Sequence, residues 1–185
     1  MDQDQLDYTL QLHNLWVNTK GDEGAKVCLS GQNLDGLDLS NRDLNTVCFN
    51  GTSLIRTQLS NTNLYLAEMT GVCCRGANLS GSSLIAANLN GADFSFADAA
   101  NANFRGADLS GSFIKGANFD KVNFDGTRLN GAFMRNMSLK CAYFNKTDLR
   151  GADLTGADLS GVDLCNTDLR GTNLNRIKVD EFTKF

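Results

Sequence analysis

Large hydrophobic residues occupy every fifth position along most of this chain. The series starts at Leu29 and runs without a break to Leu174, and 28 of its thirty members are Leu, Phe, Met or Ile. Small residues, mostly Ala, Thr, Val or Ser, stand two positions before each member. All sixteen glycines between residues 27 and 176 stand two positions after a member. Any fold of this chain must therefore repeat one local structure every five residues.

This period of five fits neither a helix nor a flat strand. On an α-helix, steps of five rotate by about 140°, which would scatter the large residues around the whole circumference. On a flat strand, an odd step would send alternate members to opposite faces. The members share one core only if the chain turns a corner in every repeat, where Gly and Asn tolerate a positive φ. Four right-angle corners make a coil of twenty residues, so thirty repeats predict about seven and a half coils and a rod roughly 36 Å long.

Several repeats have the sequence Ala-Asp/Asn-Leu-Ser/Thr-Gly, as at residues 77–81, 107–111 and 152–156. This unit resembles the A(D/N)LxG repeat of pentapeptide-repeat proteins, and the resemblance covers about four fifths of the chain. The resemblance implies an all-β solenoid, namely a right-handed quadrilateral parallel β-helix. Its handedness is implied by the family and does not follow from the periodicity.

The chain is expected to divide into three segments. Residues 1–26 are predicted to be a capping helix and linker, with an amphipathic α-helix over residues 4–18 that covers the first coil. Residues 27–176 form the β-helix. Residues 177–185 form a short C-terminal tail or cap.

Two departures from the repeat need a structural explanation. Arg42 stands at an inward position of the first coil. We expect it either to pair with an acid of the N-terminal segment, of which Asp22 and Glu23 are nearest in sequence, or to extend its guanidinium group into solvent. Ala99 leaves the core short of volume, and Phe96, at a corner where glycine is usual, is expected to fill part of that space.

The bulk composition excludes several classes of function. The 185 residues include 17 basic and 21 acidic side chains, a net charge of −4, whereas nucleic-acid-binding domains carry a basic excess. No apolar run approaches the roughly 20 residues of a membrane span, and the first residues lack the features of a secretory signal. We therefore expect a cytoplasmic protein that binds neither membrane nor nucleic acid, with six reduced cysteines too dispersed to bind a metal, and no cofactor.

The sequence contains no arrangement typical of an active site. It has no phosphate-binding loop, no nucleophile with a neighbouring base and no dinucleotide-binding fingerprint. Asp148 and Asp168 should lie side by side in adjacent coils, but Arg150 and Arg170 flank them and no cleft or metal site is predicted nearby. The simplest interpretation is a solvated ladder of charges. We predict no catalytic residue.

One outward-facing column contains two phenylalanines where Asn or Asp is usual. Residues twenty apart should stack on one face, which places Phe113 beside Phe133, with Lys115, Arg135 and Arg75 on the same face. Aromatic and arginine side chains anchor protein interfaces, so this group is a candidate binding site for a protein partner. The alternative is a cross-strand aromatic pair that only stabilises the fold.

Two further apolar groups are candidate contact sites. Tyr65 and Ile85 should stack on another face, with Leu66 at the adjoining corner. The C-terminal segment is the second group, and it could cover the last coil or meet a second copy of the chain end to end in a homodimer. Its apolar residues are Ile177, Val179, Phe182 and Phe185.

Three classes of function remain to be compared. The favoured hypothesis is a non-enzymatic scaffold that binds a protein partner through its flat faces. The second follows from the resemblance, because some pentapeptide-repeat proteins mimic DNA, bind DNA gyrase and protect it from quinolones or toxins. Mimicry requires a dense acidic surface, but residues 27–176 carry 14 acidic and 13 basic side chains. The third class, an enzyme, has no support in the motifs.

Overall fold

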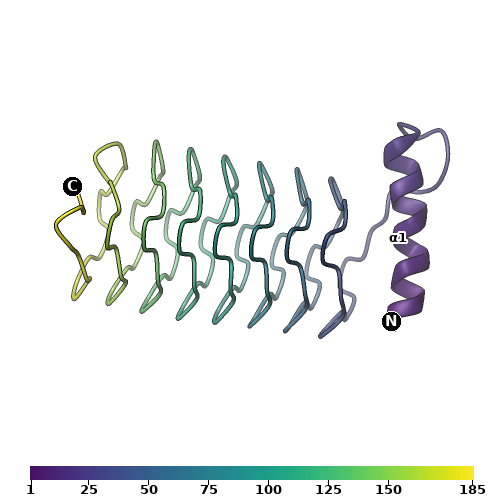
Figure 1. Cartoon of the computed structure of the whole chain (residues 1–185), viewed down its shortest axis with the longest axis horizontal. Coiled ribbons are helices and arrows are strands. Elements are labelled where there is room, and N and C mark those ends of the chain that lie inside the picture. Colours follow the sequence, from purple (N-terminus) through teal and green to yellow (C-terminus); the bar gives the residue numbers. More distant parts are fainter.

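The computed structural model describes residues 1–185 as an elongated stack of coils with one helix at its N-terminal end (Figure 1). This helix, α1, spans Gln3–Asn18, and the C-terminus lies at the opposite end of the stack. The coils contain no long strands, because each straight side contributes a single residue to a parallel bridge with the next coil. The predicted β-helical solenoid and the predicted N-terminal helix are confirmed.

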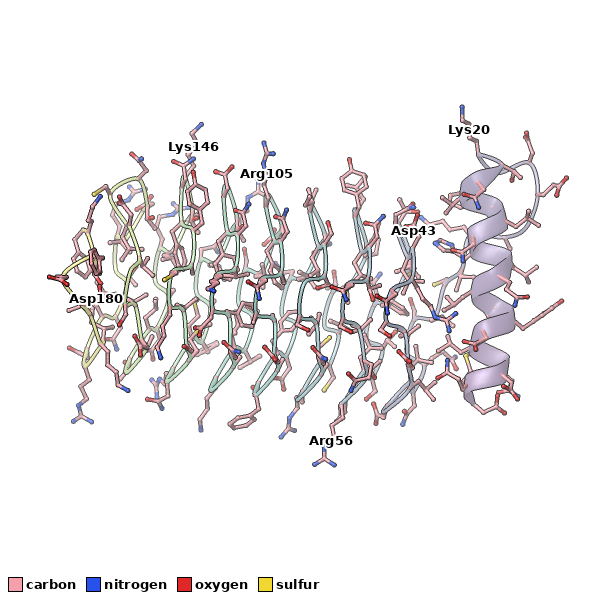
Figure 2. The ribbon with its side chains drawn as sticks, viewed as in Figure 1. Lys20, Asp43, Arg56, Arg105, Lys146 and Asp180 are labelled. Atoms are coloured by element: carbon pink, nitrogen blue, oxygen red, sulfur yellow. The ribbon has the colours of Figure 1, made fainter.

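The bridges establish the register between coils. The first joins Cys28 to Cys48, and every later bridge except the last also joins residues twenty positions apart. The last joins Asp163 to Lys184. Four ladders of bridges therefore run along the rod, and a residue's place in the twenty-residue coil decides which face it occupies. Figure 2 shows the outward side chains, with Arg56 and Arg105 on opposite sides of the rod.

Asp and Asn are frequent at the bridging position because their side chains stabilise the turn that follows. The Oδ1 atom of Asp108 accepts a hydrogen bond from the backbone N–H of Ser110 at 3.0 Å, and Asp153 accepts one from Thr155 at the same distance. Such a bond between a side chain and the backbone two residues later fixes the direction of the chain before the corner.

The corners adopt the left-handed backbone conformation that the sequence predicts. Gly91 has φ +65°, and a Cβ atom built on it would meet nothing within 4 Å. Leu66 and Phe96 hold similar φ values of 54° and 62° at other corners. The corner therefore favours glycine without requiring it, and a larger residue there projects outward.

The core is a single column of large side chains along the axis of the rod. Leu109 and Leu129, twenty positions apart, are both completely buried. Threonines at the small inward positions are satisfied within the core: the hydroxyl of Thr52 donates to the carbonyl of Leu29 at 2.7 Å, one coil earlier. Inward threonine is tolerated because its hydroxyl always meets a carbonyl of the preceding coil.

The expected role of Phe96 is wrong. Its side chain is 60% exposed and lies outside the rod, so it fills no space beside Ala99. Ala99 has three buried phenylalanines as neighbours along the core: Phe94 and Phe104 belong to the repeats before and after it, and Phe119 stands at the same place one coil later. Their ring centroids are 5.4 to 6.2 Å apart, so the small residue accommodates an aromatic cluster.

Helix α1 covers the open end of the first coil and pairs with its free backbone groups. The amide of Gln3 donates to the carbonyl of Asp38 at 3.0 Å and accepts from the N–H of the same residue at 2.9 Å, as a neighbouring strand would. The ring of His13 also pairs with two backbone groups: its Nε2 bonds to the carbonyl of Asn45 at 3.0 Å, and its Nδ1 accepts a hydrogen bond from the N–H of Val27 at 3.3 Å. Because an exposed strand edge is a template for unwanted pairing, these contacts protect the end of the solenoid.

Arg42 pairs with an acid of the N-terminal segment, as predicted, but not with either of the two acids of that segment nearest to it in sequence. Its guanidinium group contacts the carboxylate of Asp7 at 2.7 Å, and Asp22 and Glu23 are not involved. Among the acids of the N-terminal segment, Asp22 and Glu23 are nearest to Arg42 in sequence. Asp7 is nearer in space, because α1 lies across the first coil with its first turns over Arg42. An acid of the N-terminal segment does pair with this arginine.

The C-terminal segment continues the stack. Lys178 pairs with Asp158, and the carboxylate of Asp180 accepts a hydrogen bond from the N–H of Gly161 at 2.9 Å. Ile177 is half-buried against the core. Neither α1 nor any other part of the chain forms a helix with the length and apolarity needed to span a bilayer.

Candidate functional site

Phe113 and Phe133 belong to the ladder that also contains Asp93 and Asp153, and we call the side of the rod that carries this ladder the aromatic face. The two phenylalanine rings lie in nearly parallel planes, 6° apart, with their centroids separated by 5.0 Å. Each side chain is 47% exposed. The rings therefore stack along the rod and present their edges to solvent.

Both phenylalanines lack a turn hydrogen bond that their neighbours on the ladder, Asp93 and Asp153, make. On one side of the pair, Asp93 accepts from the N–H of Ser95 at 2.9 Å, and on the other side Asp153 accepts from Thr155. A phenyl ring has no acceptor for the corresponding N–H groups of Lys115 and Arg135. Two consecutive coils thus lack a local interaction worth about 0.5–1.5 kcal/mol each, while the ring stacking returns about 0.5–1.5 kcal/mol.

A hollow of about 300 Å³ lies beside the two rings. Its walls are Phe113, Phe133, Lys115 and Arg135, which the sequence predicted to lie together, and Ser95, which it did not. The small side chain of Ser95 creates the depression, because the same column has long basic side chains in the adjoining coils. Arg75 does not line this hollow.

Arg75 lines a second hollow of about 390 Å³, which also reaches Ser95. Phe96 and Arg56 form its outer walls, together with Ile55. We call the two hollows, joined at Ser95, the cationic groove. Sequence reasoning missed Phe96 and Arg56 here, although both stand at corner positions, and corner side chains project outward from a convex bend.

The ring of Phe96 is held over the next coil. A Cβ atom on Gly116, the corner residue one coil later, would lie only 2.8 Å from this ring. Gly116 therefore leaves the space that the ring occupies along the edge of the aromatic face. At Gly91, by contrast, a Cβ atom would meet nothing within 4 Å.

The cations of the groove differ in how far they are neutralised. Arg135 forms an ion pair with Asp153, and the nearest approach of Arg75 to Asp93 is a long 3.9 Å. Lys115 and Arg56 form no ion pair. Partial burial opposes the charged form of Asp153, but hydrogen bonds from Thr155 and Arg135 outweigh it and keep the pKa of this carboxyl below its usual value.

Neither Asp148 nor Asp168, the two acids of the predicted charge ladder on a neighbouring face, has a raised pKa. A hydrogen bond from Arg150 holds the pKa of Asp148 below its usual value, and one from Arg170 lowers the pKa of Asp168 to about 2. Arg150 also approaches Asp168 at 3.7 Å. Both carboxylates are ionised and paired, whereas a general acid needs a raised pKa.

The other predicted contact residues are spread over the rod. Tyr65 and Leu66 are about 45% exposed, and no hollow forms beside them or Ile85. At the C-terminal end, exposure is 51% for Val179, 66% for Phe182 and 60% for Phe185. Homodimerisation through this end stays a prediction.

The six cysteines do not gather in one cluster, although Cys28 and Cys48 are neighbours in adjacent coils. The thiols of Cys28 and Cys48 lie 3.2 and 3.0 Å from the same hydroxyl oxygen, that of Ser30. Cys74 is buried in the core, and burial raises the pKa of its thiol. No group of three or more His, Cys, Asp or Glu side chains is arranged to hold a metal ion.

The sequence profile described as pentapeptide repeats matches this chain in eight copies, over residues 48–84, 77–116, 87–126, 117–156 and 148–180. The matches cover well over half of the chain. The chain therefore belongs to the pentapeptide-repeat family, as its repeat unit predicted. No curated protein matches its sequence.

Solved structures of similar chains include the following two. A trypsin-treated variant of QnrB1, described as a plasmid-mediated fluoroquinolone resistance protein, is 20% identical over 85% of this chain and 87% of its own, with a TM-score of 0.62. Rfr23 from the cyanobacterium Cyanothece 51142 is 22% identical over 84% and 89% of the two chains, with a TM-score of 0.45. At these identities, the likeness to QnrB1 shows a shared fold and no shared partner.

Proposed function

We propose that this protein is a non-enzymatic interaction scaffold whose rod of about seven and a half coils presents a binding site for a protein partner on the aromatic face. The observation that carries the proposal is the stacked, half-exposed pair Phe113 and Phe133 beside a hollow rimmed by Lys115 and Arg135. Interface hot spots have this composition, with aromatic anchors and arginine next to a pocket.

The alternative role, stabilisation of the fold alone, explains the pair less well. The stacking energy of the rings is offset by the two turn hydrogen bonds that phenylalanine cannot make. The exposed ring edges also gain nothing from burial in the free protein. A partner that covers the ring edges would gain binding free energy from them, because burying apolar surface contributes about 25 cal/mol per Å².

The test replaces both rings by the residue that the repeat favours. Phe113→Asn/Phe133→Asn should restore the turn hydrogen bonds and keep the fold while removing the anchors. Tyr143→Asn is a matched control, since Tyr143 is a 54% exposed aromatic residue at the same repeat position on another ladder. In affinity captures analysed by mass spectrometry, the double variant should lose partners that the wild type and the control both retain. Identical partner sets for all three proteins would refute the proposal.

A gyrase-binding DNA mimic is the second candidate function. Its support is the shared fold with QnrB1, and the charge distribution opposes it, since residues 27–176 are almost neutral and the aromatic face carries a cationic groove. A supercoiling assay with and without a quinolone separates the two functions. The scaffold proposal expects no protection of gyrase at micromolar protein, and clear protection would favour the mimic.

A further inference from the structure

We propose that the cationic groove binds an extended, acidic segment of a partner protein, with two carboxylates of that segment on either side of an apolar side chain. This inference rests on the proposed function and specifies the chemistry of the partner. It follows from three features of the groove: its charge, the position of its apolar walls and its spacing along the rod.

The charge of the groove is opposite to that of the whole protein. The chain has a net charge of −4, yet the groove gathers Arg56, Arg75, Lys115 and Arg135. The only acid of this ladder between Arg56 and Arg135 is Asp93, and it meets Arg75 at 3.9 Å. Arg135 is paired with Asp153, whereas Lys115 and Arg56 form no ion pair. Cations that are not compensated within the protein attract an acidic partner, and they set its orientation as well as its rate of association.

The apolar walls lie between these cations. The ring of Phe96, 60% exposed, stands on one side of Ser95, and Phe113 and Phe133 stand on the other. Ser95 is the one small residue between Arg75 and Lys115 in its column, so it opens a gap between two long basic side chains. An aromatic or aliphatic side chain that enters this gap would bury the exposed faces and edges of the rings on both sides.

The spacing of the cations fits an extended peptide. Arg75 and Lys115 are two coils apart, which corresponds to about 10 Å at a strand spacing of about 4.8 Å. In an extended chain, alternate side chains lie on one face, and residues four positions apart are about 13 Å from each other. A segment with acidic residues at its first and fifth positions and an apolar residue at its third therefore directs all three side chains at the groove, and the long side chains of Arg75 and Lys115 span the remaining difference in distance.

A single-stranded nucleic acid is the competing ligand, because basic grooves with aromatic side chains also bind bases by stacking. The structure favours the peptide. Phe113 and Phe133 stack on each other at 5.0 Å and leave no room for a base between them. In addition, the overall negative charge of the chain repels a phosphate backbone beyond the groove.

The test uses a fluorescently labelled peptide with the sequence Gly-Glu-Ser-Phe-Ser-Glu-Gly and the full-length protein. Fluorescence anisotropy should show binding that weakens as salt is added, since the carboxylate contacts are exposed. A peptide with Gln in place of both Glu, a peptide with Ser in place of Phe, and a labelled single-stranded oligonucleotide should each bind at least about tenfold more weakly.

The protein variants localise the binding. Lys115→Glu should weaken binding of the acidic peptide at least about tenfold. The matched control Arg105→Glu, at the same repeat position but half a twenty-residue coil from Lys115 and therefore on the opposite side of the rod, should change it less than about twofold. No binding of the acidic peptide at millimolar concentration, equal loss in both variants, or tighter binding of the oligonucleotide would overturn the inference.

The inference and the proposed function fail in different ways. If Phe113→Asn/Phe133→Asn loses protein partners while Lys115→Glu retains them, the aromatic face is a binding site and the acidic segment is the wrong partner. If the double phenylalanine variant keeps every partner, the proposed function itself is refuted.

Discussion

Ala99 shows that a residue can depart from the repeat and still fit the fold. Consensus at this position is Leu or Phe, so the sequence alone predicts a deficit of volume. In the structure, the rings of Phe94, Phe104 and Phe119 meet around it. The neighbours of a core residue come from the coils before and after it, and their combined volume cannot be judged from a single repeat.

This packing makes a prediction that opposes the consensus. Ala99→Leu should destabilise the protein by about 1–3 kcal/mol, because a larger side chain must displace the aromatic cluster. Urea unfolding followed by circular dichroism would measure the change. A variant more stable than the wild type would show that Ala99 leaves a cavity and that the cluster does not fill it.

The phenylalanine pair on the aromatic face leads to a second prediction at the same scale. Phe113→Asn/Phe133→Asn should change the free energy of unfolding by less than about 1 kcal/mol, because restored turn hydrogen bonds offset the lost stacking. The same urea experiment measures it. A loss of several kcal/mol would assign the rings a structural role and weaken the proposed binding site.

Sequence reasoning placed most of the candidate site correctly at this scale. The twenty-residue coil was enough to bring Phe113, Phe133, Lys115 and Arg135 together, because register alone decides which residues share a face. Sequence reasoning missed Phe96 and Arg56 as walls of the groove. Both stand at corners, where side chains project outward, but how far a corner side chain reaches along the rod, as the ring of Phe96 does over Gly116, does not follow from the register.

At the scale of the element, α1 illustrates a different limit. Its existence follows from the amphipathic pattern, and the predicted range of 4–18 differs from the observed helix by one residue. The contact between Arg42 and Asp7 depends instead on the angle at which the helix crosses the first coil. That angle is set by packing of Leu6 and Leu10, which are completely buried, and no local sequence signal encodes it.

The same helix should respond to pH through His13, the only histidine of the chain. Its Nε2–H donates to the carbonyl of Asn45 at 3.0 Å, and its Nδ1 accepts from the N–H of Val27 at 3.3 Å, an arrangement that needs the neutral ring. Burial lowers the pKa of His13 below its ordinary 6.5, against the raising effects of the Asn45 carbonyl and of Asp43. Lys26 also lowers it slightly.

The sign of the effect follows from this lowered pKa. Above about pH 6.5 the ring is neutral in both the folded and the unfolded state, and stability is at its maximum. As pH falls below that value, the unfolded state takes up a proton first, so the docking of α1 should weaken. Hydrogen bonds from Ser40 hold the pKa of Asp38, whose backbone contacts α1, below its usual value, so this carboxyl does not contribute in the interval.

Trp16 provides the readout, since its ring stacks on His13 with centroids 6.0 Å apart. Its fluorescence should report unfolding of α1 at a lower urea concentration at pH 5.5 than at pH 7.5. In His13→Gln, which lacks the titrating group, the two midpoints should coincide. Equal midpoints in the wild type would contradict the assignment.

The whole rod is defined by one geometric property: residues twenty positions apart are neighbours in adjacent coils. The period of five, the exclusive phase of the glycines and the absence of any proline predicted this arrangement from sequence. The end of the rod is less regular, because the last bridge joins residues twenty-one positions apart, Asp163 and Lys184. The C-terminal residues no longer follow the repeat, so periodicity carries no information there.

Electron paramagnetic resonance distances between paired spin labels test this claim most directly. Labels attached through unnatural amino acids at turn positions, of which Asn50 and Asn130 are half-buried and Arg170 is exposed, leave the six native cysteines in place. The pair at Asn50 and Asn130 spans four coils and should be about 19 Å apart, and the pair at Asn50 and Arg170 spans six coils and should be about 29 Å apart. Moving the second label from Asn130 to Arg170, forty residues or two coils further, should lengthen the distance by about 10 Å. Distances unrelated to the number of coils would contradict the twenty-residue register.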